Sequence, residues 1–319
     1  MINIMKLIRG RYPIKKKLGS YCVATLGNFD GMHLGHQSLF KKLKSLGKEL
    51  NLPTVIIVFE PQPKEFFSEN QPGSRLMRFR EKWDSFQAWE VDFLICLRFN
   101  QALANLPPEN FVKEILVDQL GIEGIVVGDD CRFGAKRAGN YQLLKKLGKR
   151  YCFKAIEMAP VLYKYQRISS TRIRRALEKG NLDLVRSLLG RPYWLCGKVL
   201  TGEKLGRKLG FPTANINLHR NKVSLTGIFV IRAYLANEVF QGVASLGVRP
   251  TFGGTRILLE VYLFNFSRNI YGCYLRVEFL YKLRSEKCFV SVGDLVKQMH
   301  QDVLEAKNYF LTKDCYYPN

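Results

Sequence analysis

The sequence predicts an α/β protein with two domains: an N-terminal doubly wound parallel sheet and a C-terminal antiparallel β-barrel that ends in a helix. Strand-like and helix-like stretches alternate through the first half, which is typical of parallel strands joined by crossovers. From Trp194 onward, short strands are separated by turns rich in Gly and Asn. Between these two regions of the sequence, Gly190-Arg191-Pro192 breaks a helix. We therefore place the domains at residues 1–188 and 189–319.

Composition and charge limit the classes of function. A chain of 319 residues with 47% hydrophobic and 12% aromatic residues has enough apolar material for two cores. Its 50 basic and 27 acidic side chains give a formal charge of +23, which favours an anionic partner such as nucleotide phosphate or nucleic acid. The lysines are scattered and no nucleic-acid-binding motif accompanies them, so nucleic acid is the less favoured partner.

Cysteine usage and hydropathy indicate a cytoplasmic location. The 8 cysteines form no Cys-x-x-Cys pair and no signal-like segment opens the chain, a pattern typical of reduced thiols in the cytoplasm. No apolar run approaches the roughly twenty residues that a membrane-spanning helix needs. We therefore expect no membrane partner.

The segment from Tyr21 to Leu50 predicts a strand, a glycine turn and an amphipathic helix that begins at His33-Leu34-Gly35-His36. Unpaired backbone N–H groups and the helix dipole favour an anion at such a helix start. Gly35 would let the anion approach the backbone, and Asn28 and Asp30 add polar groups to the turn. A nucleotide phosphate is the obvious ligand.

Two other interpretations of the histidine pair remain open. Histidines at a helix start commonly pack or cap the helix without any part in chemistry. A metal site is disfavoured because no third Cys or His lies nearby at the usual spacing.

Strands and helices continue to alternate after this segment. Apolar and β-branched runs predict strands over 54–59, 93–97 and 125–127, and helical spacing of apolar residues predicts helices near 76–86, 107–115 and from 143. In such folds ligands bind beyond the carboxyl ends of the parallel strands. We therefore expect the histidine turn, the Glu60-Pro61-Gln62-Pro63 loop and the loop from Gly128 to Gly134 to share one edge of one sheet.

The third of these loops carries Asp129 and Asp130 directly after a predicted strand. Two carboxylates there could hold a metal ion, a ribose hydroxyl or another substrate group. They could equally cap the following helix or turn, where Asp is common.

A second helix start that suits an anion lies between Ile168 and Leu177. Three hydroxyl residues, Ser169 to Thr171, precede three arginines within the first turns of a helix that ends near Gly180. The arginines oppose the helix dipole, and a bound phosphate would resolve that conflict. Together with the histidine turn, this helix start predicts a clamp around a triphosphate.

The first half resembles a known family through five motifs in order: GNFDGMHLGHQ, FEPQP, LRFN, VVGDDCRFGAKRAG and ISSTRIRRAL. They are similar to the FMN adenylyltransferase module of the prokaryotic bifunctional riboflavin kinase/FAD synthetase family, a group of HxGH nucleotidyltransferases. The resemblance implies that ATP binds between the histidine turn and the Ser-Ser-Thr-x-x-Arg helix. The FMN phosphate would then attack the α-phosphorus and expel pyrophosphate, without a covalent intermediate.

The resemblance also implies which residues form this site. Both histidines, His33 and His36, would be catalytic. The residues implied for ATP binding are Gly27, Phe29, Asp30, His33, His36, Ser169, Ser170, Thr171 and Arg174. Those implied for FMN binding are Asn28, Glu60, Asp129 and Asp130.

Three positions of the first half depart from the family pattern. Gln62 stands where histidine is usual, Cys131 where phenylalanine is common, and Asn140 where aspartate is usual. A glutamine side chain forms hydrogen bonds but cannot become cationic, so we expect weaker attraction of anions at its loop.

The second half predicts a small barrel with a glycine-rich loop. Strands are predicted over 195–200, 228–235, 239–246, 257–263 and 274–280, followed by a helix from Val292 to Ala306. The loop, GEKLGRKLGFPTANIN from Gly202 to Asn217, combines glycines, basic residues and oxygen-bearing side chains, as sites for Mg²⁺ and phosphates do. The alternative is an ordinary turn stopped by proline.

This half is similar to the riboflavin kinase module of the same family, through GRKLGFPTAN, TGIFV, GVASLGVRPTF, LLEVYLFNF and LRSEKCF. The resemblance implies that Thr213 and Asn215 hold Mg²⁺ with ATP, and that Glu260 is the general base for the ribityl hydroxyl. Further residues implied for ATP binding are Gly206, Arg207, Gly210 and Pro212, and those for flavin binding are Arg284 and Glu286.

Glu260 also stands out without the resemblance, because it interrupts the apolar run LLEVYL. A salt bridge to Arg249 or Arg256 is the structural alternative. Ser245, Leu225 and Tyr262 depart from the usual asparagine, proline and histidine of the family, which affects flavin fit or loop stiffness rather than the residues assigned to chemistry.

The sequence thus predicts an enzyme that converts riboflavin to FMN and FMN to FAD, with ATP as co-substrate and Mg²⁺ as cofactor. The partners are riboflavin, FMN, FAD and ATP, and the sequence makes no prediction of oligomeric state. Two alternatives stay open. One is a riboflavin kinase with weakened or lost adenylyltransferase activity, and the other is a basic RNA-binding protein.

Overall fold

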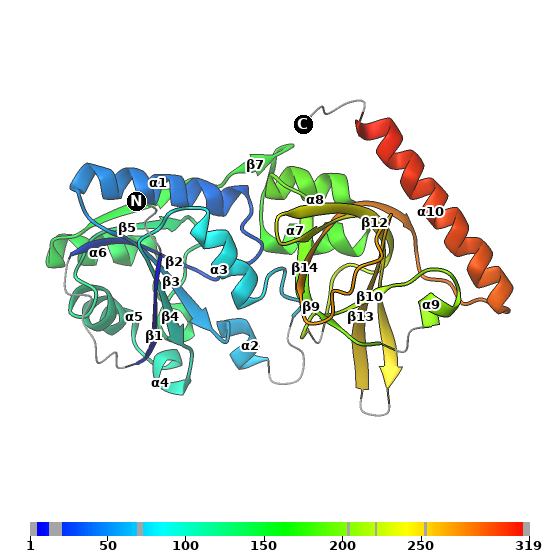
Figure 1. The fold of residues 1–319 in the computed structure, drawn as a ribbon. Coiled ribbons are helices and arrows are strands. Elements are labelled where there is room, and N and C mark those ends of the chain that lie inside the picture. The colour runs from blue at the N-terminus through cyan, green and yellow to red at the C-terminus, as the bar shows by residue number, and fades with distance from the viewer. Residues whose placement is uncertain are drawn as a thin grey trace. The chain divides into compact units, whose positions relative to one another are not determined.

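The computed structural model describes residues 5–12, 21–68, 73–202, 205–220, 222–251 and 254–314. Its contacts group the chain into two compact units: Met1–Gly73 with Met77–Ser169, and Ser74–Leu76 with Ser170–Asn319. Figure 1 shows the ribbon of both units. The domain boundary that we predict after residue 188 stays a prediction.

A six-stranded parallel sheet forms the first unit, in the order β1-β4-β3-β2-β5-β6. This confirms the doubly wound sheet, because the chain runs from central β2 through β3 to β4 and then returns to the other side of β2 as β5 and β6. The strands are β1 (Lys6–Arg11), β2 (Cys22–Leu26), β3 (Thr54–Glu60), β4 (Phe93–Arg98), β5 (Ile122–Gly128) and β6 (Lys154–Met158).

Alternate residues of the sheet face helices on opposite sides. Cys22, Ala24 and Leu26 pack in one core with Phe111, Leu144 and their neighbours. On the other side Val23 approaches Gly47 of α1. The helices are α1 (Leu34–Leu50), α2 (Pro63–Phe67), α3 (Phe79–Gln87), α4 (Gln101–Ala104), α5 (Pro108–Asn110), the π-helix η1 (Phe111–Val117), the 3₁₀-helix η2 (Ala135–Arg137) and α6 (Tyr141–Tyr151).

The three predicted motif loops follow three neighbouring parallel strands, β3, β2 and β5. Their carboxyl ends therefore meet at one edge, as we predicted, and the sheet order reverses between β2 and β5. Asn140, which replaces the usual aspartate, caps α6 by accepting a hydrogen bond from the Leu143 N–H at 3.0 Å.

A closed barrel of six antiparallel strands forms the second unit, in the order β10-β13-β12-β11-β14-β9. The strands are β9 (Tyr193–Leu200), β10 (Ala214–Asn217), β11 (Gly227–Leu235), β12 (Glu238–Thr251), β13 (Gly254–Leu263) and β14 (Tyr274–Arg284). The barrel confirms the prediction for this half. Only β10 was absent from the predicted strands, and it closes the barrel between β9 and β13.

This unit also contains helices, of which the second and the last pack against the barrel strands. They are α7 (Ser170–Glu178), α8 (Leu182–Leu189), the short α9 (Leu205–Lys208) and the C-terminal α10 (Val292–Asp314). Ala306 and Phe310 of α10 are buried against Ile228, Val230 and Val243 of the barrel. No helix in the described part of the chain is long and apolar enough to cross a membrane. A hairpin of β7 (Leu162–Tyr163) and β8 (Gln166–Arg167) leads into α7.

Candidate functional sites

The histidine turn holds His33 and His36 ring against ring at the start of α1. Their centroids are 3.6 Å apart and the planes differ by 18°. His33 is the N-cap of α1, and its Nδ1 accepts a hydrogen bond from the His36 backbone N–H at 3.3 Å. A Cβ at Gly35 would lie 3.1 Å from the same Nδ1. In this structure Gly35 therefore makes room for the His33 ring, whereas the sequence suggested room for an anion.

Both rings are uncharged near neutral pH. Burial lowers the pKa of His33 from 6.5 to about 4. Burial also holds the pKa of His36 well below 6.5, and the charges of His33 and Lys82 add to this shift. His36 Nδ1 is buried and has no hydrogen-bond partner among the described residues. The pair therefore offers hydrogen-bonding nitrogens rather than positive charge.

The turn before the histidines is conformationally unusual. Phe29 and Met32 have positive φ angles of 46° and 51°, values that non-glycine residues rarely adopt. The Phe29 ring packs edge-on against His36, with centroids 5.3 Å apart, and against Phe86 of α3 at 6.0 Å. These aromatic contacts between the turn, α1 and α3 stabilise the strained turn. They also hold the His36 ring in one orientation.

The structure brings the other predicted residues of this unit to the same sheet edge. Asn28 is half-buried in the turn after β2, and Glu60 is the half-buried last residue of β3. Buried Asp30 accepts a hydrogen bond from the Met77 N–H at 2.9 Å. At Gly27 a Cβ would lie 3.1 Å from the Phe29 ring.

Asp129 and Asp130 share one arginine that the sequence analysis did not single out. Arg167 donates two hydrogen bonds of 2.8 Å to the carboxylate of Asp129, and its Nη2 lies 2.8 Å from Asp130 Oδ1. The carboxylate of Asp129 is thus paired with an arginine, and this one guanidinium offsets one of the two carboxylate charges. No group of three or more His, Cys, Asp or Glu side chains in the described residues is arranged to hold a metal ion.

Gln62, the main departure in this half, is buried at the loop after β3. Its N–H donates to Glu65 Oε2 at 3.0 Å, and its side-chain Nε2 has no hydrogen-bond partner among the described residues. A neutral amide donor thus stands in the loop where the family usually has histidine.

Ser169 is the last residue of the first unit. Helix α7 of the second unit contains Ser170, Thr171 and Arg174. Arg174 Nε donates to the Ser74 carbonyl oxygen at 2.6 Å. The predicted triphosphate clamp draws on both units and stays a prediction.

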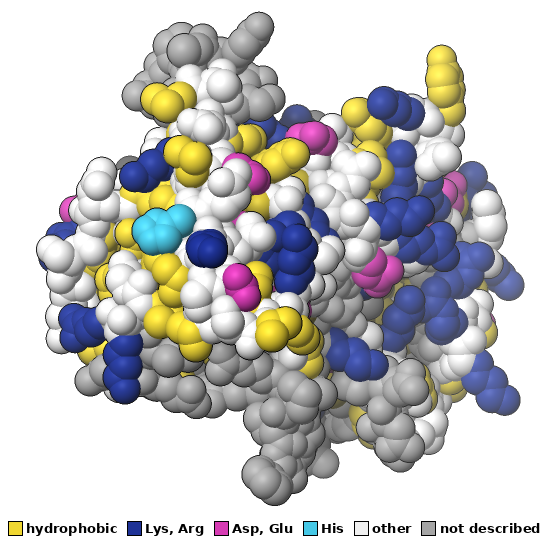
Figure 2. Space-filling view, turned by 90° about the vertical axis from the view of Figure 1, so that its right-hand side faces the viewer, with side chains coloured by type: hydrophobic (Ala, Val, Ile, Leu, Met, Phe, Trp, Pro, Cys, Tyr) yellow, Lys and Arg dark blue, Asp and Glu magenta, His cyan; other side chains and the backbone are white. Residues whose placement is uncertain are grey.

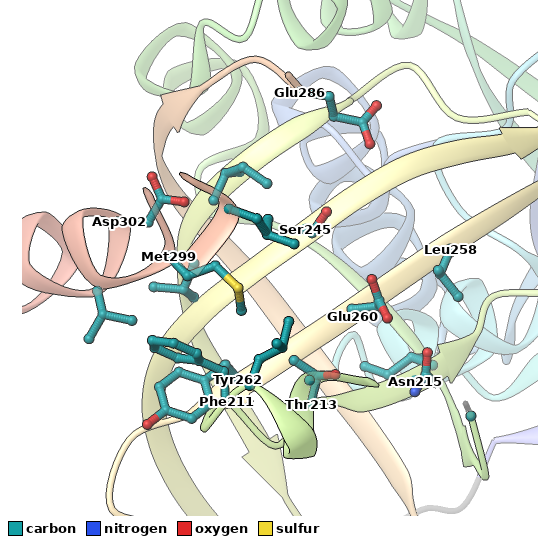
Figure 3. Close-up of a pocket in the computed structure, with 18 of the residues that line it drawn as sticks. Phe211, Thr213, Asn215, Ser245, Leu258, Glu260, Tyr262, Glu286, Met299 and Asp302 are labelled. Atoms are coloured by element: carbon teal, nitrogen blue, oxygen red, sulfur yellow. The ribbon is translucent and has the colours of Figure 1, made fainter. Parts of the chain in front are cut away.

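The second site is a cavity of about 750 Å³ in the barrel unit (Figure 3). The glycine-rich loop, β10, β12, β13, the segment after β14 and α10 all contribute to its wall. The polar side chains of the wall are Thr201, Thr213, Asn215, Asn217, Ser245, Glu260, Tyr262, Arg284, Glu286, Lys287 and Asp302. The apolar ones include Phe211, Val243, Leu258, Phe289 and Met299.

Strand pairing aligns three of these polar residues. Asn215 of β10 is opposite Glu260 of β13, and Glu260 is opposite Ser245 of β12. The three side chains therefore form a row across neighbouring strands on the cavity face. Figure 3 shows Thr213 beside Asn215, close to Glu260. The side chains of Arg249 and Arg256 lie outside the described residues, and so does the alternative salt bridge of Glu260.

Close packing explains the glycines of the adjacent loop. A Cβ at Gly206 would lie 2.4 Å from the Phe211 carbonyl oxygen and 3.0 Å from Thr213 Oγ1, and one at Gly202 would lie 2.2 Å from Asn215 Nδ2. Gly210 has a positive φ of 88°. Arg207 and Pro212 are exposed on this loop. The loop thus closes tightly over the two predicted Mg²⁺ ligands.

At the other end of the cavity, Arg284 ends β14 and forms a largely buried ion pair with Asp302 of α10. Its Nε and Nη2 lie 2.8 and 2.7 Å from the two carboxylate oxygens. Asp302 was not among the predicted residues, since an acid at helical spacing in α10 has no sequence signal of its own. Tyr262, in place of histidine, packs against Phe211 with ring centroids 5.4 Å apart.

Comparisons with known proteins match both units. A family model described as FAD synthetase matches residues 15–172, and one described as riboflavin kinase matches residues 189–310. A bifunctional riboflavin kinase/FMN adenylyltransferase from Buchnera aphidicola subsp. Schizaphis graminum is 43% identical over 310 residues, 96% of this chain and 99% of that protein. The protein of the same description from Escherichia coli K12 is 40% identical over 311 residues, 97% of this chain and 99% of that protein.

A solved structure has a similar fold. It is described as a macrolide-efflux protein from Streptococcus pneumoniae, is 30% identical, and matches with a TM-score of 0.81 over 93% of this chain and 97% of that chain. The two matched models and the full-length relatives agree in pointing to one family. The chain belongs to the bifunctional riboflavin kinase/FMN adenylyltransferase family.

Proposed function

We propose that this chain makes FAD from riboflavin in two steps, one in each unit, with the residues of the two candidate sites in the roles given below. The family has two activities: ATP phosphorylates riboflavin to FMN, and adenylyl transfer from ATP to FMN then gives FAD and pyrophosphate. ATP is the co-substrate of both steps. The chain is an enzyme of FAD biosynthesis.

The row of Asn215, Glu260 and Ser245 on the wall of the barrel cavity is the observation that carries the kinase proposal. The Glu260 carboxylate would accept the proton of the ribityl 5′-hydroxyl as that oxygen forms a bond to the γ-phosphorus of ATP. The bond from the γ-phosphorus to the bridging oxygen breaks, and ADP leaves with that electron pair. The apolar wall limits the access of water to this step.

The residues present fit a magnesium ion held with ATP. Thr213 and Asn215 offer neutral oxygens, and Mg²⁺ is commonly bound by few protein ligands together with substrate phosphates. The loop packs closely against these two side chains, so that a Cβ at Gly202 would overlap with Asn215 and a Cβ at Gly206 with Phe211 and Thr213. This close packing fits a binding site for the ion. When bound, the ion would offset the negative charge of the phosphates.

For the adenylyltransferase step, the hydrogen bond to His33 Nδ1 supports one tautomer. Because Nδ1 accepts the His36 N–H, a neutral His33 carries its proton on Nε2. That N–H would donate to an ATP phosphate as an oxygen of the FMN phosphate attacks the α-phosphorus and pyrophosphate leaves. The attacking phosphate is already an anion, so the step needs no protein base.

A riboflavin kinase with weakened adenylyl transfer is the second candidate. Gln62 favours it, because its neutral amide replaces a residue that can carry positive charge. Adding FMN, ATP and Mg²⁺ to the purified chain separates the candidates: FAD forms under the main proposal, and its absence at saturating ATP would leave the kinase alone.

We also propose the domain boundary at residues 188/189 and a cytoplasmic location. The riboflavin kinase model begins at residue 189, which supports the boundary. The described cysteines are free thiols, which suits a reducing compartment.

Single substitutions test the assignment of one step to each site. His36→Ala should abolish FAD formation from FMN and leave FMN formation from riboflavin intact, and Glu260→Gln should do the reverse. Both rates are measured by chromatography of the flavins, with thermal unfolding as the check on folding. Loss of both activities in either well-folded variant would contradict independent sites.

A further inference from the structure

The kinase cavity contains a contact that the proposed reaction leaves unexplained: the Glu286 carboxylate lies against the backbone of Gly247. A Cβ added at Gly247 would lie 1.9 Å from Glu286 Oε1, 2.6 Å from its Cδ and 2.9 Å from its Oε2. Real Cβ atoms essentially never come within 3.0 Å of a heavy atom outside their own and adjacent residues, and all three atoms here belong to the flexible end of the Glu286 side chain. No side chain fits at position 247 while Glu286 keeps this position.

An added side chain at position 247 would conflict with the carboxylate of Glu286 and not with the local backbone conformation. Gly247 is not among the glycines with positive φ, so alanine could adopt its backbone conformation. It lies on β12 opposite Leu258, two residues after Ser245, which is opposite Glu260. Because side chains alternate along a strand, positions 245 and 247 share the cavity face, about 7 Å apart.

Glu286 is an exposed residue in the segment that follows β14, two residues after Arg284. Arg284 is anchored by its ion pair with Asp302, and its Nη1 donates to the Ser285 carbonyl oxygen at 3.1 Å. The same guanidinium lies 5.8 Å from the centre of the Phe289 ring. Figure 3 shows Glu286 beyond Ser245 along β12, at the opposite end of the cavity from Thr213 and Asn215.

We propose that Gly247 is a positioning residue for Glu286: its missing side chain forms the slot that seats the carboxylate at the flavin end of the cavity. This inference rests on the proposed kinase function. A carboxylate accepts hydrogen bonds, and riboflavin offers an imide N–H and ribityl hydroxyls as donors. Filling the slot displaces the carboxylate and weakens riboflavin binding, while the row around Glu260 keeps its place.

The test compares Gly247→Ala, Glu286→Ala and the double variant in the full chain. Riboflavin affinity is measured by fluorescence titration, and KM and kcat by FMN formation. Each single variant should raise the Kd and KM for riboflavin by about tenfold or more, the loss expected for a hydrogen bond to a charged group. The kcat should change little, since the lost contact is made equally in ground and transition states.

The double variant gives the sharper result. Its affinity for riboflavin should equal that of Glu286→Ala. The alanine at 247 should cause no further loss of affinity, because the carboxylate that it would displace is already absent. Gly293→Ala is the matched control, since its added Cβ would meet only Ser291 Oγ at an ordinary 3.6 Å, and it should behave as wild type. If Gly247→Ala fails to fold, the double variant decides, because removing the carboxylate removes the overlap.

Unchanged riboflavin affinity in a folded Gly247→Ala, or losses that add in the double variant, would overturn the inference. A wild-type chain that neither binds nor phosphorylates riboflavin would instead overturn the kinase proposal. The two failures are therefore distinguishable.

Discussion

At the scale of single residues, His33 joins helix capping to ligand binding through its two ring nitrogens. Nδ1 accepts the His36 N–H and so caps α1, which leaves Nε2 for a substrate. The sequence offered capping and phosphate binding as alternatives. The geometry makes them compatible, because each uses a different nitrogen of one ring.

The lowered pKa of His33 predicts a loss of stability in mild acid. Its pKa is about 4 in the folded protein against 6.5 in the unfolded chain, so between these values the unfolded chain binds more protons. Stability is therefore complete above pH 6.5 and falls as the pH drops toward 4, by up to about 3 kcal/mol for this one group.

Urea unfolding at pH 7.5 and pH 5 measures the effect. His33→Asn keeps a good N-cap but removes the titrating ring, so the variant should lose less stability between the two pH values than wild type does. Equal losses in both proteins would show that His33 does not carry the effect.

At the scale of elements, the ion pair of Arg284 and Asp302 joins β14 to α10 beside the kinase cavity. The two side chains are 13% and 6% exposed. Gln298 Nε2 also donates to Asp302 Oδ1, at 3.0 Å. This network fixes α10, which supplies Met299 to the cavity wall, and it fixes the start of the Glu286 loop.

Asp302→Ala should therefore destabilise the barrel unit by roughly 3 kcal/mol, because it leaves a buried guanidinium without its partner. Chemical denaturation followed by circular dichroism measures this change. Glu305→Ala is the control, since Glu305 is an exposed acid on the same helix whose carboxylate bonds only Gln301 in the described contacts. A similar small effect in both variants would refute a structural role for the ion pair.

The elements that sequence patterns predicted well are those with uniform burial. β2 and β3 are buried along almost their whole length, so their apolar runs are unambiguous. β1, β6 and β10 were missed because KLIRGR, KAIEM and ANIN mix polar and apolar residues at sheet edges or in a short closing strand.

Site prediction from the sequence had a similar limit. Motif residues such as Glu260 and Thr213 were identifiable because their neighbours in sequence are distinctive. Arg167, Asp302 and the slot at Gly247 depend on contacts between segments far apart in the chain, such as Arg167 with Asp129 and Gly247 with Glu286. A single sequence carries no signal for such pairs.

At the scale of the whole molecule, two units of different architecture carry two steps of one route, each with phosphate-rich substrates. Figure 2 shows Lys and Arg side chains crowded on one side of the face in view, with few Asp and Glu among them. The formal charge of +23 suits the attraction of anionic nucleotides. Because the chain belongs to a family of enzymes, we set aside the alternative of an RNA-binding protein.

The most direct test of two activities in one chain is a time course of flavins. Purified protein is incubated with riboflavin, ATP and Mg²⁺, and the products are separated by chromatography. Our account predicts that FMN appears first and FAD follows as FMN is consumed. FMN that accumulates without any FAD at saturating ATP, or riboflavin that stays unconverted, would contradict it.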